Sequence, residues 1–167
     1  MNPLQKIITH LSLTPHPEGG YFKETYRSQE IIASVALPIR FKDARNMSTS
    51  ILYLLESKNI SQWHRILSDE IWYFHQGLPV ELCSINEIGE LFTYELGLSQ
   101  NQTPQVLIPQ GHWFAAKPIG LEGFSLMSCH VSPGFDFCDF ELADIKLLQK
   151  KWPNHQKVIG HFSKKQI

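Results

Sequence analysis

The sequence predicts an all-β domain with short helices at its two ends, built as a sandwich or a barrel. Between residues 48 and 131 the chain is a succession of short segments rich in β-branched and aromatic residues. Turn signals separate these segments, for example Ile88-Gly89 and Pro109-Gln110-Gly111. Helical spacing of apolar residues occurs only near the N-terminus and after Glu141. Many short strands at such intervals are typical of sandwiches and barrels.

The order of the expected elements follows from the same patterns. Leucines and isoleucines from Leu4 to Leu11 recur at i, i+3, i+4 and i+7, which predicts a short amphipathic helix. A polar loop over Ala36–Asn46 is long enough to act as a lid. A second helix follows Glu141 and ends at Trp152-Pro153. The segments expected as strands are Tyr21–Ser28, Ser50–Leu55, Gln62–Leu67, Glu70–His75, Val80–Asn86, Leu91–Leu96, Val106–Ile108, Trp113–Lys117 and Phe124–Val131.

Size and composition limit the domain number and the partners. With 167 residues, 43% of them hydrophobic, the chain can build one core. We expect residues 1–153 to form this domain and residues 154–167 to be a loose tail. The net charge is −1 and the charges are scattered, so we expect no nucleic-acid or membrane partner. Three cysteines without a C-x-x-C pair, and no signal-peptide pattern, predict a reduced, cytoplasmic protein.

Residues that can do chemistry concentrate between positions 63 and 77. This stretch holds His64, His75, an Asp-Glu pair and four aromatic residues. Side chains two apart on a strand share a face, so Glu70 and Trp72 should point the same way. A histidine and a carboxylate facing a pocket with aromatic walls could hold a small molecule. We therefore take His64, Glu70 and His75 as the candidate catalytic residues.

This histidine and carboxylate allow several chemical interpretations. His64 and Glu70 could ligate a divalent metal, with His75 as a third ligand only if a β-bulge turned it round. Alternatively, His64 carries a proton in a metal-free site while Glu70 orients it or titrates. The pair could also serve ligand binding without turnover, or only hydrogen-bond each other in the core. We favour a site with no metal or other cofactor.

Further residues are candidates for contacts with a ligand. The glycines of Glu18-Gly19-Gly20 allow close backbone approach, either at the barrel mouth or only in a tight turn. Arginine could meet an anionic group, and aromatic rings offer a stacking surface. The candidate ligand-binding residues are Glu18, Tyr21, Glu24, Arg65, Trp72 and Phe114. By contrast, the alternating aromatics of Pro133–Phe140 are interpreted as core, and His16 as an ordinary surface residue.

Two stretches resemble the paired motifs of the cupins. In the first cupin motif, G-x5-H-x-H-x3-4-E-x6-G, His64 matches the first histidine, and Glu70 and Gly77 match the E-x6-G spacing. Ile66 stands at the second histidine position. The stretch Pro109–Phe114 resembles the second motif and carries Phe114 at its histidine position.

Four longer matches narrow the resemblance to one cupin family of unknown function. They are P-H-P-E-G-G-Y-F-K-E-T-Y-R-S, S-x-W-H-R-x-x-S-D-E, P-Q-x-x-I-P-x-G-x-W-F and P-G-F-D-F-x-D-F-E-L, in this order between Leu4 and Leu142. The resemblance implies a double-stranded β-helix, or jelly-roll barrel, and a homodimer. It implies no reaction.

Some metal-free cupin epimerases act on nucleotide sugars with a histidine base. By that analogy we expect a small polar or anionic metabolite, sugar-like or nucleotide-like, and isomerase-type or epimerase-type chemistry. The alternatives are a metal-dependent cupin enzyme that uses His64 and Glu70, and a protein that only binds its ligand.

Overall fold

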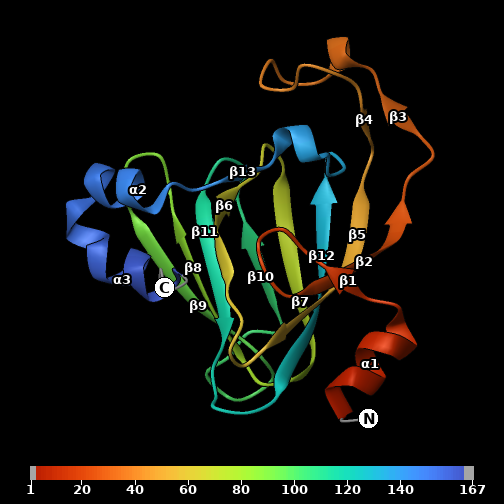
Figure 1. Ribbon diagram of the computed structural model, residues 1–167. Helices are drawn as coiled ribbons and strands as arrows, with labels where there is room; N and C mark the ends of the chain where they lie inside the picture. The colour runs from red at the N-terminus through yellow and green to blue at the C-terminus, as the bar shows by residue number, and fades with distance from the viewer. Residues whose placement is uncertain (1–2, 164–167) are drawn as a thin grey trace.

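Two antiparallel sheets packed face to face form the body of the molecule (Figure 1). The computed structural model describes residues 3–163. One sheet has the order β1 (Thr14–Pro15), β2 (Tyr21–Arg27), β5 (Thr49–Glu56), β12 (Phe124–Ser132), β7 (Asp69–Gly77) and β10 (Gln105–Ile108). The other has the order β13 (Glu141–Leu142), β6 (Ser61–Arg65), β11 (Trp113–Pro118), β8 (Val80–Ile85) and β9 (Leu91–Leu96).

This order interleaves strands from distant parts of the chain, as a jelly roll does. Strand β12 lies between β5 and β7, and β11 lies between β6 and β8. The predicted all-β class is confirmed. Every strand expected from the sequence is present, and its ends lie within two residues of the expected ones. The alternation of apolar residues and the turn residues between strands are therefore sufficient to locate them.

The remaining short elements lie outside the two sheets. They are α1 (Pro3–Leu11), β3 (Ile31–Ile32), η1 (Ser34–Ala36), β4 (Arg45–Asn46), η2 (Phe137–Asp139), α2 (Ile145–Lys151), η3 (Pro153–His155) and α3 (Gln156–His161). Helix α1 packs on the outer face of the six-stranded sheet, against Leu54 and Leu126. Residues 28–48 project from the barrel as an arm that carries β3 and β4 (Figure 1). Within residues 3–163 no helix is long and apolar enough to cross a membrane.

Strand alternation divides the apolar residues between an inner cluster and two outer ones. One outer cluster lies under α1, and the other, called the outer cluster below, includes Trp63, Trp113, Trp152, Ile159 and Phe162. The inner cluster fills the space between the sheets and contains Tyr53, Trp72 and Phe114. On β6, His64 faces this interior, whereas its neighbour Trp63 faces outward and packs against α2 and α3. A single strand thus supplies a polar residue to the interior and a large aromatic anchor to the outer face.

Residues 154–163, expected as a loose tail, form a packed element instead. Ile159 and Phe162 are fully buried, and the ring of Phe162 lies edge-on to Trp63 with centroids 6.0 Å apart. Trp63 Nε1 donates a hydrogen bond to Ile159 O at 3.1 Å. The C-terminal segment therefore covers the outer face of β6. Residues 164–167 of the expected tail lie outside the described part of the chain.

Candidate functional site

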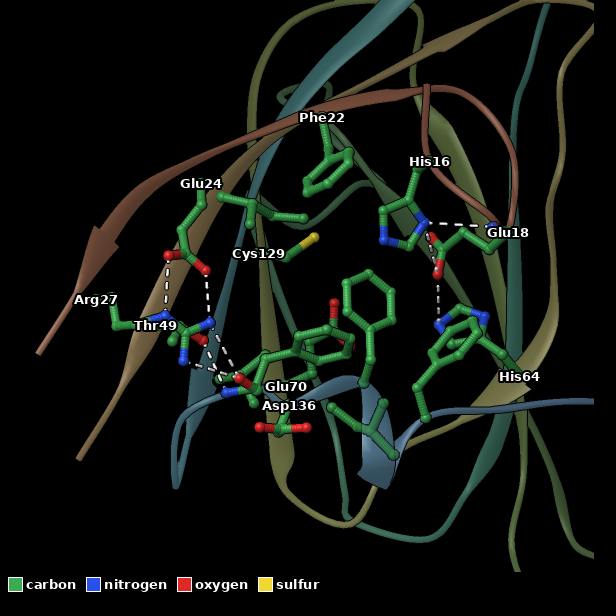
Figure 2. Close-up of a pocket in the computed structure, with 16 residues that line it drawn as sticks. His16, Glu18, Phe22, Glu24, Arg27, Thr49, His64, Glu70, Cys129 and Asp136 are labelled. Atoms are coloured by element: carbon green, nitrogen blue, oxygen red, sulfur yellow. Dashed lines mark hydrogen bonds and ion pairs between the residues drawn. The ribbon is translucent and has the colours of Figure 1, made fainter. Parts of the chain in front are cut away.

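A cavity of about 240 Å³ lies inside the barrel, between the sheets and residues 135–140 (Figure 2). We call residues 135–140 the lid segment. Strands β2, β5, β7 and β12, the region of β6 and the turn at residues 16–18 supply the other walls. The polar lining consists of His16, Glu18, Glu24, Arg27, Thr49, His64, Glu70 and Asp136. The apolar lining consists of Phe22, Ile51, Ile66, Cys129, Val131, Phe135, Phe137 and Phe140.

Glu18 enters the cavity from a tight turn that precedes β2. Gly19 and Gly20 have φ angles of +124° and +68°, which other residues rarely adopt. A Cβ at Gly19 would overlap the carbonyl oxygen of Ile60, so the turn lies directly against the start of β6. Glu18 Oε1 accepts a hydrogen bond from Ser61 Oγ at 2.8 Å. The glycines thus let the turn carry a carboxylate onto β6.

His64 forms a buried ion pair with this carboxylate (Figure 2). Its Nε2 lies 3.1 Å from Glu18 Oε2, and the two side chains are 2% and 8% exposed. Its Nδ1 lies 2.7 Å from the carbonyl oxygen of Gln62, which can only accept, so Nδ1 carries a proton. One further proton then lies between Nε2 and the Glu18 carboxylate. The residue paired with His64 is Glu18 and not Glu70, the partner considered from the sequence.

Glu70 lines the same cavity from β7. The residue is 7% exposed. Burial, and after it the negative charge of Glu18, raises the pKa of Glu70 to about 8. Its carboxyl group is therefore mostly protonated at neutral pH. A protonated carboxyl group in the same cavity as the His64–Glu18 pair could act as a proton donor.

His16, interpreted from the sequence as a surface residue, also lies in the cavity wall (Figure 2). Its Nδ1 accepts a hydrogen bond from the Glu18 N–H at 3.3 Å. Its ring meets Phe22 edge-on, with centroids 4.6 Å apart, and stacks on Phe137 at 6.3 Å. Burial lowers the pKa of His16, an effect that the charge of Glu18 opposes. Sequence patterns could not place it, because it lies in an irregular segment without periodicity.

A second ion pair, between Arg27 and Glu24, lines the cavity opposite His64 (Figure 2). Arg27 donates from Nε and Nη2 to the two carboxylate oxygens of Glu24, at 2.9 and 2.7 Å. Nη1 donates to Asn46 Oδ1 at 2.8 Å, and Nη1 and Nη2 both donate to Phe135 O. All three nitrogens of this guanidinium group are therefore engaged by the protein itself.

The lid segment is tied to the arm. Its three phenylalanine rings pack edge to face, with centroids 5.0 to 6.2 Å apart. Arg45, in the arm, donates to the Asp139 carboxylate at 2.7 and 2.6 Å, and both side chains are buried. The sequence suggested a lid at Ala36–Asn46 and a core role for residues 133–140. In the structure the second of these segments covers the cavity, and the first contributes the arginine that anchors it.

Two aromatic candidates lie below the cavity instead of in its wall. Trp72 and Phe114 are buried in the inner cluster, edge-on to each other with centroids 6.4 Å apart. Phe114 supports the imidazole of His64, at a centroid distance of 4.0 Å. Neither ring is among the residues that line the cavity, where the sequence suggested that both would lie.

Three other candidates lie away from the cavity. Tyr21 packs with α1 on the outer face of the six-stranded sheet. Arg65 pairs with Glu141 at the surface, where Nη2 lies 2.6 Å from Oε2. His75 does coincide with a register shift between β7 and β12, but its side chain is exposed and its Nε2 lies 2.5 Å from Ser128 Oγ. The bulge therefore does not bring His75 into the site.

The residues of the cavity do not fit a metal centre. Ile66, at the second histidine position of the first cupin motif, lines the cavity with an apolar side chain. Phe114 occupies the histidine position of the second motif. Among residues 3–163 no three His, Cys, Asp or Glu side chains are grouped so that they could hold a metal ion. Several of the donors in the lining are engaged within the protein: His64 with Glu18, His16 Nδ1 with the Glu18 N–H, and Glu24 with Arg27.

Comparison with known proteins gives the family of the chain. Residues 5–143 match the family described as Cupin superfamily (DUF985). The Uncharacterized protein YML079W of Saccharomyces cerevisiae is 31% identical over 148 residues, which covers 81% of this chain and 73% of the yeast protein.

Solved structures agree with this assignment. Protein SO0799 from Shewanella oneidensis superposes with a TM-score of 0.85 at 37% identity, over 99% of this chain and 100% of that one. A hypothetical protein from Leishmania major gives 0.87 at 30% identity, over 97% and 99%. Oxalate decarboxylase from Bacillus subtilis gives only 0.55 at 16% identity, over 91% of this chain and 37% of that one, and shows the fold alone. The chain therefore belongs to the cupin superfamily, in its DUF985 family.

Proposed function

We propose that this protein is a metal-independent acid/base catalyst that moves a proton on a small, neutral polar molecule, as isomerases and epimerases do. The observation that carries the proposal is the His64–Glu18 pair, which is buried, shares one proton and lines a cavity. A buried ion pair is weak evidence for a purely stabilising role, because desolvation offsets much of its Coulomb energy. A pair that lines an internal cavity is in addition accessible to a ligand.

Glu18 is the proton acceptor in this proposal. Its Oε2 faces His64 Nε2, which can hold the carboxylate ionised and oriented while an oxygen lone pair takes a proton from the ligand. When the proton from the ligand arrives, the pair as a whole gains one positive charge. His64 is thus a positioning residue, held by the Gln62 carbonyl on its other nitrogen.

Glu70 is the proton donor. Its raised pKa of about 8 leaves it protonated at neutral pH, so it can give a proton where Glu18 accepts one. Because both groups line one cavity, a ligand held there can lose a proton to one and gain a proton from the other. This arrangement supports isomerisation or epimerisation, reactions that change the position of a proton and need no oxidant or reductant.

Cavity size and charge support a small, neutral ligand. Drug-sized ligands occupy pockets of roughly 300–1,000 Å³, whereas this cavity measures about 240 Å³ and suits a molecule of monosaccharide size. Any nucleotide part would have to lie outside it. Arg27, the one arginine among the lining residues, already binds Glu24 and two backbone or amide oxygens. An anionic group would therefore have to displace Glu24, which disfavours the anionic alternative.

Hydrogen–deuterium exchange tests the proposal. The protein is incubated in D₂O with monosaccharides, keto sugars and sugar nucleotides, and the loss of carbon-bound proton signals is followed by proton NMR. We expect one class of compound to exchange. In Glu18→Gln, His64→Gln and Glu70→Gln the rate should fall by at least about 100-fold, the usual contribution of a general acid or base.

His161→Gln is the matched control. His161 on α3 also faces a carboxylate, with Nε2 3.4 Å from Oε2 of Glu81 on β8, but both side chains of this pair are solvent-exposed. It should exchange at the wild-type rate. Undiminished exchange in Glu18→Gln would refute the proposal. So would a wild-type protein that retains a sugar through purification yet exchanges nothing, a result that indicates ligand binding without turnover.

A further inference from the structure

His16 lies in the cavity wall but has no part in the proton transfer described so far. It belongs to the irregular turn before β2, its side chain is 7% exposed, and it lines the cavity beside Glu18. What it can do depends on which of its two nitrogens carries the proton.

The protein backbone determines this proton position. His16 Nδ1 faces two groups of Glu18, the backbone N–H at 3.3 Å and Oε2 at 3.6 Å. Only the N–H lies within hydrogen-bond distance. It donates to Nδ1, and a nitrogen that accepts a hydrogen bond carries no proton. In the neutral ring the proton therefore lies on Nε2. Burial lowers the pKa of His16, and the neighbouring His64 lowers it further against the opposing charge of Glu18. The neutral tautomer with Nε2–H is the form that this environment favours.

The Nε2–H group of His16 has a fixed orientation and no hydrogen-bond acceptor among residues 3–163. Phe22 meets the ring edge-on, Phe137 stacks on it, and Tyr53 and Phe140 also meet it edge-on, with centroids 5.9 and 6.2 Å away. These contacts fix the plane of the ring. In Figure 2 Nε2 is turned away from Glu18 toward the space that the lining residues enclose. Within residues 3–163 this nitrogen makes no hydrogen bond or ion pair.

We propose that the cavity takes a carbonyl compound with a C–H bond next to the carbonyl group, and that His16 Nε2–H hydrogen-bonds the carbonyl oxygen. This inference rests on the proposed function, and it names the substrate class. A carboxylate can deprotonate carbon only where a neighbouring group accepts the electron pair. A carbonyl group does so, and it needs a hydrogen-bond donor at its oxygen, where negative charge develops.

In this step the C–H bond breaks and its proton goes to Glu18. The C–H electron pair becomes the new C=C bond, and the C=O π pair moves to oxygen to form an enolate. His16 donates to that oxygen without giving up its proton, as a neutral imidazole held in one tautomer can do. Glu70 then gives its proton to carbon: the C=C π pair forms the new C–H bond, and an oxygen pair re-forms the C=O bond. Proton exchange with water returns Glu18 and Glu70 to their starting states. The product is an isomer of the substrate, and no redox partner takes part.

Two matched probe pairs test the substrate class in the full-length protein. They are 2-keto-myo-inositol with myo-inositol, and dihydroxyacetone with glycerol, which differ only in the carbonyl group. Calorimetry should show about three- to tenfold tighter binding of each ketone, the usual worth of one hydrogen bond. His16→Phe keeps an aromatic ring but no N–H, and should abolish the preference. His16→Gln keeps an N–H donor and should retain part of it.

Two spectroscopic measurements report on His16 independently of turnover. ¹⁵N NMR of labelled protein at pH 7 should show the neutral Nε2–H tautomer. Infrared spectra of ¹³C=O-labelled ketone should show a lower carbonyl stretching frequency on binding to the wild type, and no such shift in His16→Phe. A protonated Nδ1, an unchanged ketone preference in His16→Phe, or no ketone preference in the wild type would each overturn the inference.

Failure of this inference can be told apart from failure of the proposed function. C–H exchange that depends on Glu18 but is unaffected by His16→Phe would overturn the role of His16 and leave proton transfer standing. A ketone preference that depends on His16, without any C–H exchange, would support carbonyl recognition and refute catalysis.

Discussion

Glu70 is a carboxyl group that the fold keeps protonated near neutral pH. Burial, with the charge of Glu18 second, raises its pKa from the ordinary value of 4.5 to about 8. The native state thus holds this proton more tightly than the unfolded chain does. The resulting stabilisation is complete below pH 4.5 and is lost as the pH rises toward 8. A shift of this size corresponds to several kcal/mol, so the loss should be measurable.

Glu70→Gln should remove this loss, because glutamine keeps a hydrogen-bond donor and has no proton to lose. Between pH 5 and pH 8 the unfolding free energy of the wild type should fall by several kcal/mol relative to that of the variant. Urea unfolding at half-unit pH steps measures the difference. Exposed Glu122→Gln serves as the control and should give a curve parallel to the wild type. Parallel curves for Glu70→Gln as well would show that Glu70 is ionised in the native state.

The sequence predicted some residues of the cavity wall but not the contacts between them. Glu18, Glu24, His64 and Glu70 were singled out from the sequence, and all four line the cavity. Strand alternation gives the face of a side chain but not its depth. Trp72 therefore shares the inward face of β7 with Glu70 and yet lies in the packed core. The contact of His64 with Glu18 joins segments far apart in the chain, which local pattern cannot predict.

At the scale of elements, the lid segment depends on the arm for its position. The Arg45–Asp139 pair is buried, with side chains 3% and 5% exposed. Glu141, two residues after Asp139, forms a second arginine–carboxylate pair with Arg65. The side chains of this pair are 37% and 54% exposed. The two pairs have the same chemistry in different solvent environments. A comparison between them therefore isolates the effect of burial.

Asp139→Asn should destabilise the protein by about 3–5 kcal/mol, because it leaves the buried Arg45 without its counter-charge. Glu141→Gln makes the same chemical change at the exposed pair and should cost no more than about 1 kcal/mol. Guanidinium unfolding at pH 7 measures both. Equal costs would mean that the lid segment is held by its aromatic packing and not by Arg45.

The C-terminal helix α3 is a second element whose role the sequence concealed. Its segment is rich in polar and lysine residues, and too few turns follow Pro153 for an apolar period to emerge. In the structure two apolar side chains, Ile159 and Phe162, bury themselves over Trp63. The composition of the segment is that of a tail, but these two contacts make it part of the core.

Phe162→Ala should therefore cost about 3–5 kcal/mol of unfolding free energy, as large-to-small changes at buried aromatic sites do. His161→Ala, on the same helix but exposed, should cost little. Chemical unfolding followed by tryptophan fluorescence measures both values. If Phe162→Ala lowered the unfolding free energy only slightly, the packing of α3 on the sheet would contribute little to stability.

At the scale of the whole molecule, the strands and the fold class could be predicted, but the assembly of the site could not. Each strand carries its own alternation of apolar residues, so local sequence is enough to define it. The number and spacing of the strands predicted a sandwich or barrel, and only the resemblance to the cupin motifs implied the jelly-roll form. The lid segment could not be assigned, because alternating phenylalanines satisfy a core position and a cavity wall equally well. Only the tertiary contacts of Asp139 and Thr49 distinguish the two.

The homodimer expected from the family resemblance stays a prediction, and the arm is where we expect the contact. Ile31, Val35 and Ile39 are exposed on it at 66%, 95% and 102%. Exposed apolar groups clustered on a projecting segment are typical of interfaces.

Sedimentation should give twice the monomer mass of 19.2 kDa. Val35→Glu with Ile39→Glu should shift the protein to monomer, and Leu121→Glu, equally exposed but on another loop, should not. A wild-type monomer would exclude the dimer.

The placement of the tryptophans has a practical consequence. Trp63, Trp113 and Trp152 belong to the outer cluster, whereas Trp72 stands in the inner cluster, two positions from Glu70 on β7. Replacing the outer three by phenylalanine would leave one indole, in contact with Phe114, whose ring in turn meets His64 of the cavity wall. The intrinsic fluorescence of Trp72 would then report ligand binding, so that a ligand could be titrated without a label or an assay for turnover.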